Sequence, residues 1–245
     1  MIILNAGVPR SGTVFVNAIL RQILKQSGAA VSQANPHGEE LPRLIRELRR
    51  SGKERHRAVL VHTHTWHVDA TGLLANSSWV TGFVNYRDPR DVCVSLMRLH
   101  DHDLDAAIQM TLNSFAHFDE MVAALDLMVI PYELLVLNPT AHIFQMARQL
   151  GVWLGIVDVA RIQAATSSAE HRKIMEKVQK GELDTLQQRQ NRNRVLVEDP
   201  RTLINDRHIQ SGASGRWRTE LDDAQQARVN GAFASLLERF GYTQE

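Results

Sequence analysis

Buried strands and amphipathic helices alternate along this chain, and that alternation limits its possible folds more than any other feature. Short runs rich in apolar, β-branched or aromatic residues predict strands over 1–6, 58–61, 79–86 and 127–131. Apolar residues at helical spacing predict helices over 14–24, 39–50, 89–100, 104–125, 139–150 and 222–240. Strands that alternate with helices of these lengths form βαβ units around a parallel sheet. The sequence therefore predicts an α/β fold, a three-layer sandwich with a mostly parallel central sheet.

One segment, at about 176–210, interrupts this pattern. It is rich in Gln, Asn and Arg and has few large apolar residues, which is typical of a lid or a partly disordered stretch. The whole chain has 245 residues, enough for one domain with its own core. We therefore expect residues 1–245 to form a single domain with a polar, flexible, lid-like segment at about 176–210.

Composition excludes several classes of protein. Lys and Arg total 28 and Asp and Glu total 27, so the net charge of +1 argues against bulk electrostatic binding to nucleic acid or to an anionic membrane. The single cysteine, Cys93, excludes an internal disulfide and a Cys-rich metal site. No apolar run reaches the length of a membrane span, and the first residues lack the basic and apolar regions of a signal peptide. A cytoplasmic protein without nucleic-acid or membrane partners is expected.

A glycine-containing loop, GVPRSGT at residues 7–13, lies between the first strand and the first helix. Small residues let the backbone curl around a phosphate, and a helix N-terminus offers N–H groups to an anion. Gly7 and Gly12 match the outer positions of the GxxxxGK[ST] loop of nucleotide kinases, but Thr13 stands where the Lys belongs. The cation lies inside the loop instead, at Arg10. From the loop alone, phosphate binding and a plain strand–helix turn remain equally open.

Three histidines follow the strand at 58–61. His62 and His64 point to the same side of that strand, and with His67 they are a candidate metal cluster. No Cys or well-placed carboxylate completes a ligand set, so we expect no metal here.

Two motifs in order along the chain resemble those of one family. Residues 9–15, PRSGTVF, are similar to the 5′-phosphosulfate loop PKSGTTW of sulfotransferases that use 3′-phosphoadenosine 5′-phosphosulfate (PAPS). Arg10 replaces the usual Lys, as in the tyrosylprotein sulfotransferases. Residues 86–95, YRDPRDVCVS, resemble the family's 3′-phosphate motif, with Arg87 at a strand end and Ser95 eight residues later. Open α/β sheets bind ligands at that edge.

Further matches resemble the cytosolic and bacterial members and extend over roughly residues 3–242. His62-Thr63-His64 stands where they carry Lys-Thr-His, and Pro131–Leu135 resembles their PYEDL segment. Residues 165–168, ATSS, resemble the HTSF element, with Ser168 in place of its Phe. Residues 212–218, GASGRWR, resemble the RKGxxGDWK loop, although Gln210 and Ser211 stand where the Arg-Lys pair would be.

The resemblance implies a role for each matching residue. Arg10 would neutralise the leaving group, and His64 would be the general base that deprotonates the acceptor. Arg87 and Ser95 would bind the 3′-phosphate, and Phe15 would stack on adenine. The complete set of implied cofactor-binding residues is Pro9, Arg10, Ser11, Gly12, Thr13, Val14, Phe15, Arg87, Ser95, Tyr132, Thr166, Ser211 and Gly212.

The resemblance implies a PAPS-dependent sulfotransferase that acts on a hydroxyl or amine of a small-molecule acceptor, releasing 3′-phosphoadenosine 5′-phosphate (PAP). Two alternatives remain open at this point. One is a P-loop nucleotide-dependent kinase, which the missing Lys after Gly12 disfavours. The other is a catalytically degenerate PAP-binding protein, which the departure at Gln210 and Ser211 leaves open.

Overall fold

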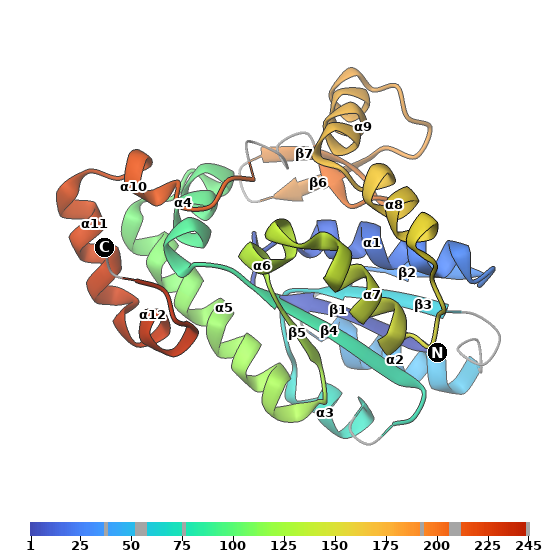
Figure 1. Cartoon of the computed structure of the whole chain (residues 1–245). Coiled ribbons are helices and arrows are strands. Elements are labelled where there is room, and N and C mark those ends of the chain that lie inside the picture. The colour runs from blue at the N-terminus through green and yellow to red at the C-terminus, as the bar shows by residue number, and fades with distance from the viewer. Residues whose placement is uncertain (37–38, 52–57, 75–76, 192–193, 206–211, 244–245) are drawn as a thin grey trace.

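A five-stranded parallel sheet forms the centre of the protein in the computed structural model, which describes residues 1–36, 39–51, 58–74, 77–191, 194–205 and 212–243 (Figure 1). Its strands lie in the order β2-β3-β1-β4-β5, and every pairing is parallel. The strands are β1 (Ile2–Gly7), β2 (Val31–Ala34), β3 (Ala58–Thr63), β4 (Val80–Tyr86) and β5 (Met128–Pro131). The predicted α/β class and parallel central sheet are confirmed, although the sequence did not predict the short polar edge strand β2.

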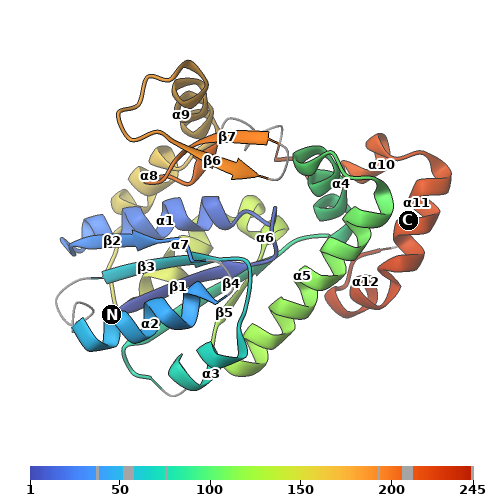
Figure 2. The same cartoon turned by 180° about the vertical axis from the view of Figure 1, so that it is seen from behind.

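Helices cover both faces of this sheet, which makes three layers (Figures 1 and 2). Successive strand residues point to opposite faces, so Ile3 packs with α1, α7 and α8, whereas Ile2 and Leu4 pack with α2, α3 and α5. The helices are α1 (Thr13–Gln26), α2 (Glu40–Ser51), α3 (Val68–Leu74), α4 (Pro89–His100), α5 (Leu104–Ala124), α6 (Tyr132–Leu137), α7 (Pro139–Gln149), α8 (Ile156–Ala165), α9 (Ser168–Lys180), α10 (Trp217–Glu220), α11 (Asp223–Ala232) and α12 (Ala234–Phe240).

The start of α4 fixes the edge of the sheet where β4 ends. Asp88 is the N-cap, its side chain accepts the Arg90 N–H, and Pro89 occupies the first turn. The Arg90 guanidinium also pairs with Asp88 at 2.7 Å and stacks over the buried ring of Trp217. Trp217 thereby anchors the last loop of the chain to α4.

The segment that was expected to be a polar lid contains regular structure. After α9, an antiparallel sheet is built from β6 (Gln187–Asn191), β7 (Arg194–Asp199) and β8 (Ile204–Asn205). It packs on the first helix of the chain, because Val14 of α1 belongs to the same apolar cluster as Val178 of α9, Leu203, and Ile204 of β8. The sequence showed no apolar alternation strong enough to predict these strands.

The C-terminal helix is also divided, contrary to the prediction of one helix over 222–240. Helix α11 ends before Phe233, whose side chain is fully buried, and α12 begins after it. Gly231, a weak helix former, precedes the break. Tyr242 then donates a hydrogen bond to Glu133 at 2.9 Å, and Glu133 accepts the Asp88 N–H at 3.1 Å, which ties the C-terminal segment to the start of α4.

Within the described ranges, none of the helices combines the length and the apolar character that crossing a bilayer requires.

Candidate active site

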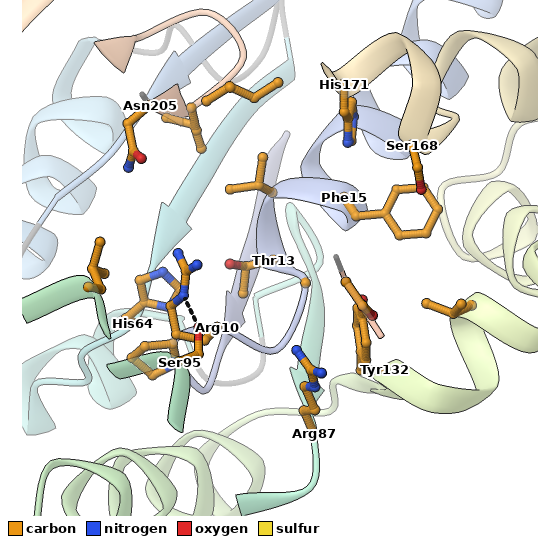
Figure 3. A pocket seen from close by; sticks show the side chains of 18 of the residues that line it. Arg10, Thr13, Phe15, His64, Arg87, Ser95, Tyr132, Ser168, His171 and Asn205 are labelled. Atoms are coloured by element: carbon orange, nitrogen blue, oxygen red, sulfur yellow. Dashed lines mark hydrogen bonds between the residues drawn. The ribbon is translucent and has the colours of Figure 1, made fainter. Parts of the chain in front are cut away.

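A cavity of about 750 Å³ lies at the carboxyl edge of the central sheet (Figure 3). Four residues that directly follow strands line it: Asn35 after β2, His64 after β3, Arg87 after β4 and Tyr132 after β5. Parallel strands end at the same edge, so residues distant in sequence meet there. The sequence-predicted residues that line the cavity are Pro9, Arg10, Gly12, Thr13, Val14, Phe15, His64, Arg87, Ser95, Tyr132, Thr166 and Gly212.

Two of the predicted residues are not among the described lining residues. Ser211 lies outside the described residues. Ser11 is fully buried, and its hydroxyl donates to the Val8 carbonyl at 2.5 Å and accepts the Asn85 side-chain amide at 3.0 Å. The expected contact of the Ser11 hydroxyl with phosphate is therefore not supported, because that hydroxyl closes the loop on β4 instead.

The conformation of the loop depends on Gly12. Its φ of 86° lies in the left-handed region, and it precedes the first residue of α1. A Cβ at this position would lie 2.6 Å from the Tyr132 ring. Glycine is therefore required both by the backbone angle and by the close approach of Tyr132.

We expect Gly12→Ala to lower the free energy of unfolding by about 2–5 kcal/mol, from the left-handed backbone and the clash together. Gly28→Ala is the matched control, because Gly28 has a φ of 71° but nothing within 4 Å of an added Cβ. That variant should lose only about 1–2 kcal/mol. Chemical denaturation measures both, and equal losses would contradict a packing role for Gly12 against Tyr132.

Three arginines place positive charge in the cavity, namely Arg10, Arg87 and Arg216. Burial, followed by the charges of Arg87 and Arg216, lowers the pKa of Arg10 to about 10. Arg10 also has a φ of 67°, and its Nε donates to the Ser95 hydroxyl at 2.8 Å. Clustered cations of this kind are stabilised by an anion that binds among them.

Arg87 is held in place from three sides. Its Nη2 donates to Asp91 at 3.1 Å and to the Ala213 carbonyl at 2.6 Å, and the guanidinium lies 4.5 Å from the centre of the Tyr132 ring. Its Nε is buried and has no hydrogen-bond partner among the described residues. A buried donor without a partner is costly, so this N–H is available for an anionic ligand.

The last loop of the site is fastened by two residues. Asp91 accepts the N–H groups of Gly215 at 2.8 Å and Trp217 at 3.2 Å, and the Tyr132 hydroxyl donates to the Gly212 carbonyl at 2.6 Å. Burial raises the pKa of Tyr132, so its hydroxyl remains a donor. Asp91, in the first turn of α4, was missed by the sequence analysis, although it lies four residues after Arg87, a recognisable ion-pair spacing.

His64 has a defined orientation. Its Nδ1 lies 2.9 Å from the Gly7 carbonyl oxygen, which can only accept, so Nδ1 carries the proton of the neutral ring. Nε2 therefore carries the lone pair. The His62 ring meets it edge-on at 4.7 Å, and His62 Nδ1 lies 3.0 Å from the Asn35 side-chain oxygen. Across the described part of the chain, no three His, Cys, Asp or Glu side chains gather as a metal would require.

The opposite end of the cavity contains aromatic rings (Figure 3). Phe15 meets the ring of His171 edge-on, with centroids 6.0 Å apart. Burial lowers the pKa of His171, so this ring is neutral near pH 7. Thr166 also lines the cavity, but its hydroxyl donates to the Ile162 carbonyl at 2.8 Å. His171 was not predicted, although it lies one helical turn beyond Ser168.

Comparisons with known proteins agree with this architecture. A mouse sulfotransferase, SULT7A1, solved as a complex with PAP, is 15% identical, with a TM-score of 0.64 over 96% of this chain and 84% of that one. A retinol dehydratase solved with androsterone and PAP is 16% identical, with a TM-score of 0.57 over 96% and 80% of the two chains. Comparison of the sequence with curated proteins gives no significant match. The family model for the sulfotransferase domain matches residues 2–241, and the chain therefore belongs to the sulfotransferase family.

Proposed function

We propose that this protein transfers the sulfuryl group of PAPS to a hydroxyl or amine of a small-molecule acceptor. The observation that carries the proposal is the convergence of Arg10, Arg87 and Arg216 on one cavity beside the N-terminus of α1. A ligand with two separate phosphate positions matches two separated arginines. Family membership supports the same reaction.

The loop and the start of α1 would bind the 5′-phosphosulfate. Backbone N–H groups at Gly12 and Thr13 belong to the first turn of the helix, where anions are stabilised by the helix dipole. Pro9, Val14 and Phe15 shape the surrounding wall. Arg10 neutralises charge on the bridging oxygen and the 5′-phosphate as that bond breaks.

Arg87 would bind the 3′-phosphate through its unpartnered Nε, and Ser95, which accepts a hydrogen bond from Arg10, would contribute its hydroxyl. Tyr132 and Gly212 hold the loop beside it. Arg216, which also lines the cavity, would supply a cation in place of the Arg-Lys pair that the sequence lacks. Thr166, Phe15 and the neutral ring of His171 would surround the adenine.

His64 would accept the acceptor's proton at Nε2 while Nδ1–H stays bonded to Gly7. The acceptor oxygen or nitrogen then forms a bond to sulfur as the bond from sulfur to the bridging oxygen breaks. The electron pair of the broken bond goes to the 5′-phosphate of PAP, next to Arg10. Catalysis consists of positioning and charge stabilisation, as in phosphoryl transfer.

Small acceptors are favoured by the cavity volume and by the androsterone and retinol in the solved complexes of retinol dehydratase. We also propose a cytoplasmic location, on the sequence argument that a single cysteine leaves no internal disulfide, which suits a reducing compartment. Cell fractionation with an activity assay tests that location.

Ligand-dependent thermal stability tests the proposal directly. PAP at a hundred times its dissociation constant should add about 2.7 kcal/mol, which raises Tm by about 5–10 °C for a chain of this size. Mg²⁺-ATP, which lacks a 3′-phosphate, is the matched nucleotide and should give a smaller shift. A shift with Mg²⁺-ATP and none with PAP would instead support a kinase. A PAP shift without sulfation of any compound in a broad acceptor screen with PAPS would support a degenerate binding protein.

A further inference from the structure

One carboxylate, Glu198, lines the cavity that receives the cofactor. It lies on β7 directly opposite Asn205 of β8, and residues opposite each other on antiparallel strands share a face. Both side chains line the cavity. The next residue, Asp199, faces the other way, where its carboxylate accepts hydrogen bonds from Thr185 and Thr202 at 2.7 Å. Strand alternation therefore directs Glu198 into the cavity and Asp199 into the turn.

Glu198 is not directly paired with any of the cavity's arginines in the described structure. Among the described residues, no ion pair or side-chain hydrogen bond involves Glu198, and no other Asp or Glu lines the cavity. A carboxylate repels the phosphates of PAPS if both occupy a partly buried space, because Coulomb energies are large where the dielectric is low. Its presence there is consistent with a second ligand that carries positive charge.

Asn205 of β8, the cross-strand neighbour of Glu198, shows which end of the cavity this pair faces. In Figure 3, Asn205 and His64 lie on the side of the cavity opposite to Phe15 and Ser168. The cavity lining also includes three apolar side chains, Leu96 and Leu99, which follow Ser95 along α4, and Met110 of α5. The acceptor region thus combines a general base and a carboxylate, with apolar side chains in the same cavity.

We infer that the acceptor is a hydroxylated compound with an apolar body and a protonated amine, and that Glu198 binds this amine. The inference rests on the proposed function, since it concerns the second substrate of that reaction. The ammonium group donates hydrogen bonds to the Glu198 carboxylate. The hydroxyl at the other end of the acceptor faces His64.

Three phenols of matched shape test the inference by titration calorimetry on the complex with PAP. Tyramine carries the ammonium group, 4-propylphenol is its neutral isostere, and 3-(4-hydroxyphenyl)propionate carries a carboxylate. The wild type should bind tyramine roughly tenfold tighter than 4-propylphenol, the lower end of what a hydrogen bond to a charged group contributes. The propionate should bind most weakly. Glu198→Gln should remove the preference for tyramine, whereas Glu182→Gln, an exposed residue outside the cavity, should retain it.

The outcomes separate this inference from the proposed function. If the wild type binds PAP but binds tyramine no tighter than 4-propylphenol, or not at all, the role of Glu198 is overturned. The proposed function is not affected by that result. The same follows if Glu198→Gln keeps the full preference for tyramine. Failure of the wild type to bind PAP contradicts the proposed function, and the inference with it. A preference that disappears only in Glu198→Gln supports the inference.

Discussion

Replacing Arg87 with alanine should lower the affinity for PAP by roughly a hundredfold or more. A charge-assisted hydrogen bond contributes about 1.5–3 kcal/mol, and the variant loses the positive charge of the guanidinium together with the Nε donor. Arg87 Nε is buried without a partner in the described structure, so the phosphate of the ligand would accept the hydrogen bond that the protein does not form. Affinity for adenosine 5′-phosphosulfate, which has no 3′-phosphate, should change far less. Titration calorimetry with both ligands measures the difference.

Two further variants show whether that loss is specific to the phosphate. Arg87 also holds Asp91 and the Ala213 carbonyl, so Arg87→Lys, which retains the charge but not the fork, separates charge from geometry. Arg98→Ala removes a partly exposed arginine of α4 that pairs with Glu220 outside the cavity, and it should leave PAP affinity unchanged. An equal loss of affinity for both nucleotides in Arg87→Ala would contradict the 3′-phosphate role.

The central sheet and the phosphate side of the site were predictable because their signals are local. Apolar runs of strand length separated by helical periodicity define a parallel sheet, whose carboxyl edge gathers the residues after each strand. His64, Arg87 and Tyr132 were singled out by motif, and each directly follows a strand. The glycine at position 12 was also predictable, since a strand–loop–helix turn requires a left-handed residue.

The small antiparallel sheet was not predictable, for a physical reason. Its first strand is polar, and Ile204 of its last strand is buried in an apolar cluster with Val14 and Val178 of helices α1 and α9. Strand propensity depends on such cross-strand and tertiary neighbours more than on local sequence. Because Glu198 and Asn205 lie on this sheet, their place in the cavity could be found only from the structure.

Side-chain direction was the other limit. The sequence identified Ser11 and Ser95 as phosphate ligands, but the hydroxyl of Ser11 turns inward to Val8, and that of Ser95 accepts a hydrogen bond from Arg10. A hydroxyl rotates to suit its neighbours, so its partner is decided by the three-dimensional arrangement. The sequence therefore predicted the backbone conformation of the loop better than the hydrogen-bond partners of its side chains.

The hydrogen bond between His64 and Gly7 fixes the chemistry that His64 can perform. Gly7 ends β1 and His64 directly follows the neighbouring strand β3, so the contact is set by the register of the sheet. With Nδ1 donating to a carbonyl, only Nε2 of the neutral ring can accept a proton. The bond orients the ring in the same way that an additional group orients the base in hydrolase triads.

His64→Ala should therefore lower kcat by roughly 10²- to 10⁴-fold, the usual contribution of a positioned general base, while PAP affinity is retained. The measurement is PAP release from PAPS with the best acceptor from the screen, alongside calorimetric titration of PAP. His67→Ala is the matched control, because His67 lies three residues away, pairs with Asp69 and does not line the cavity. Turnover equal to the wild type in His64→Ala would remove His64 from the role of base. Loss of both PAP affinity and turnover would show instead that His64 supports the loop through Gly7, and the two results are separable because kcat and PAP affinity are measured independently.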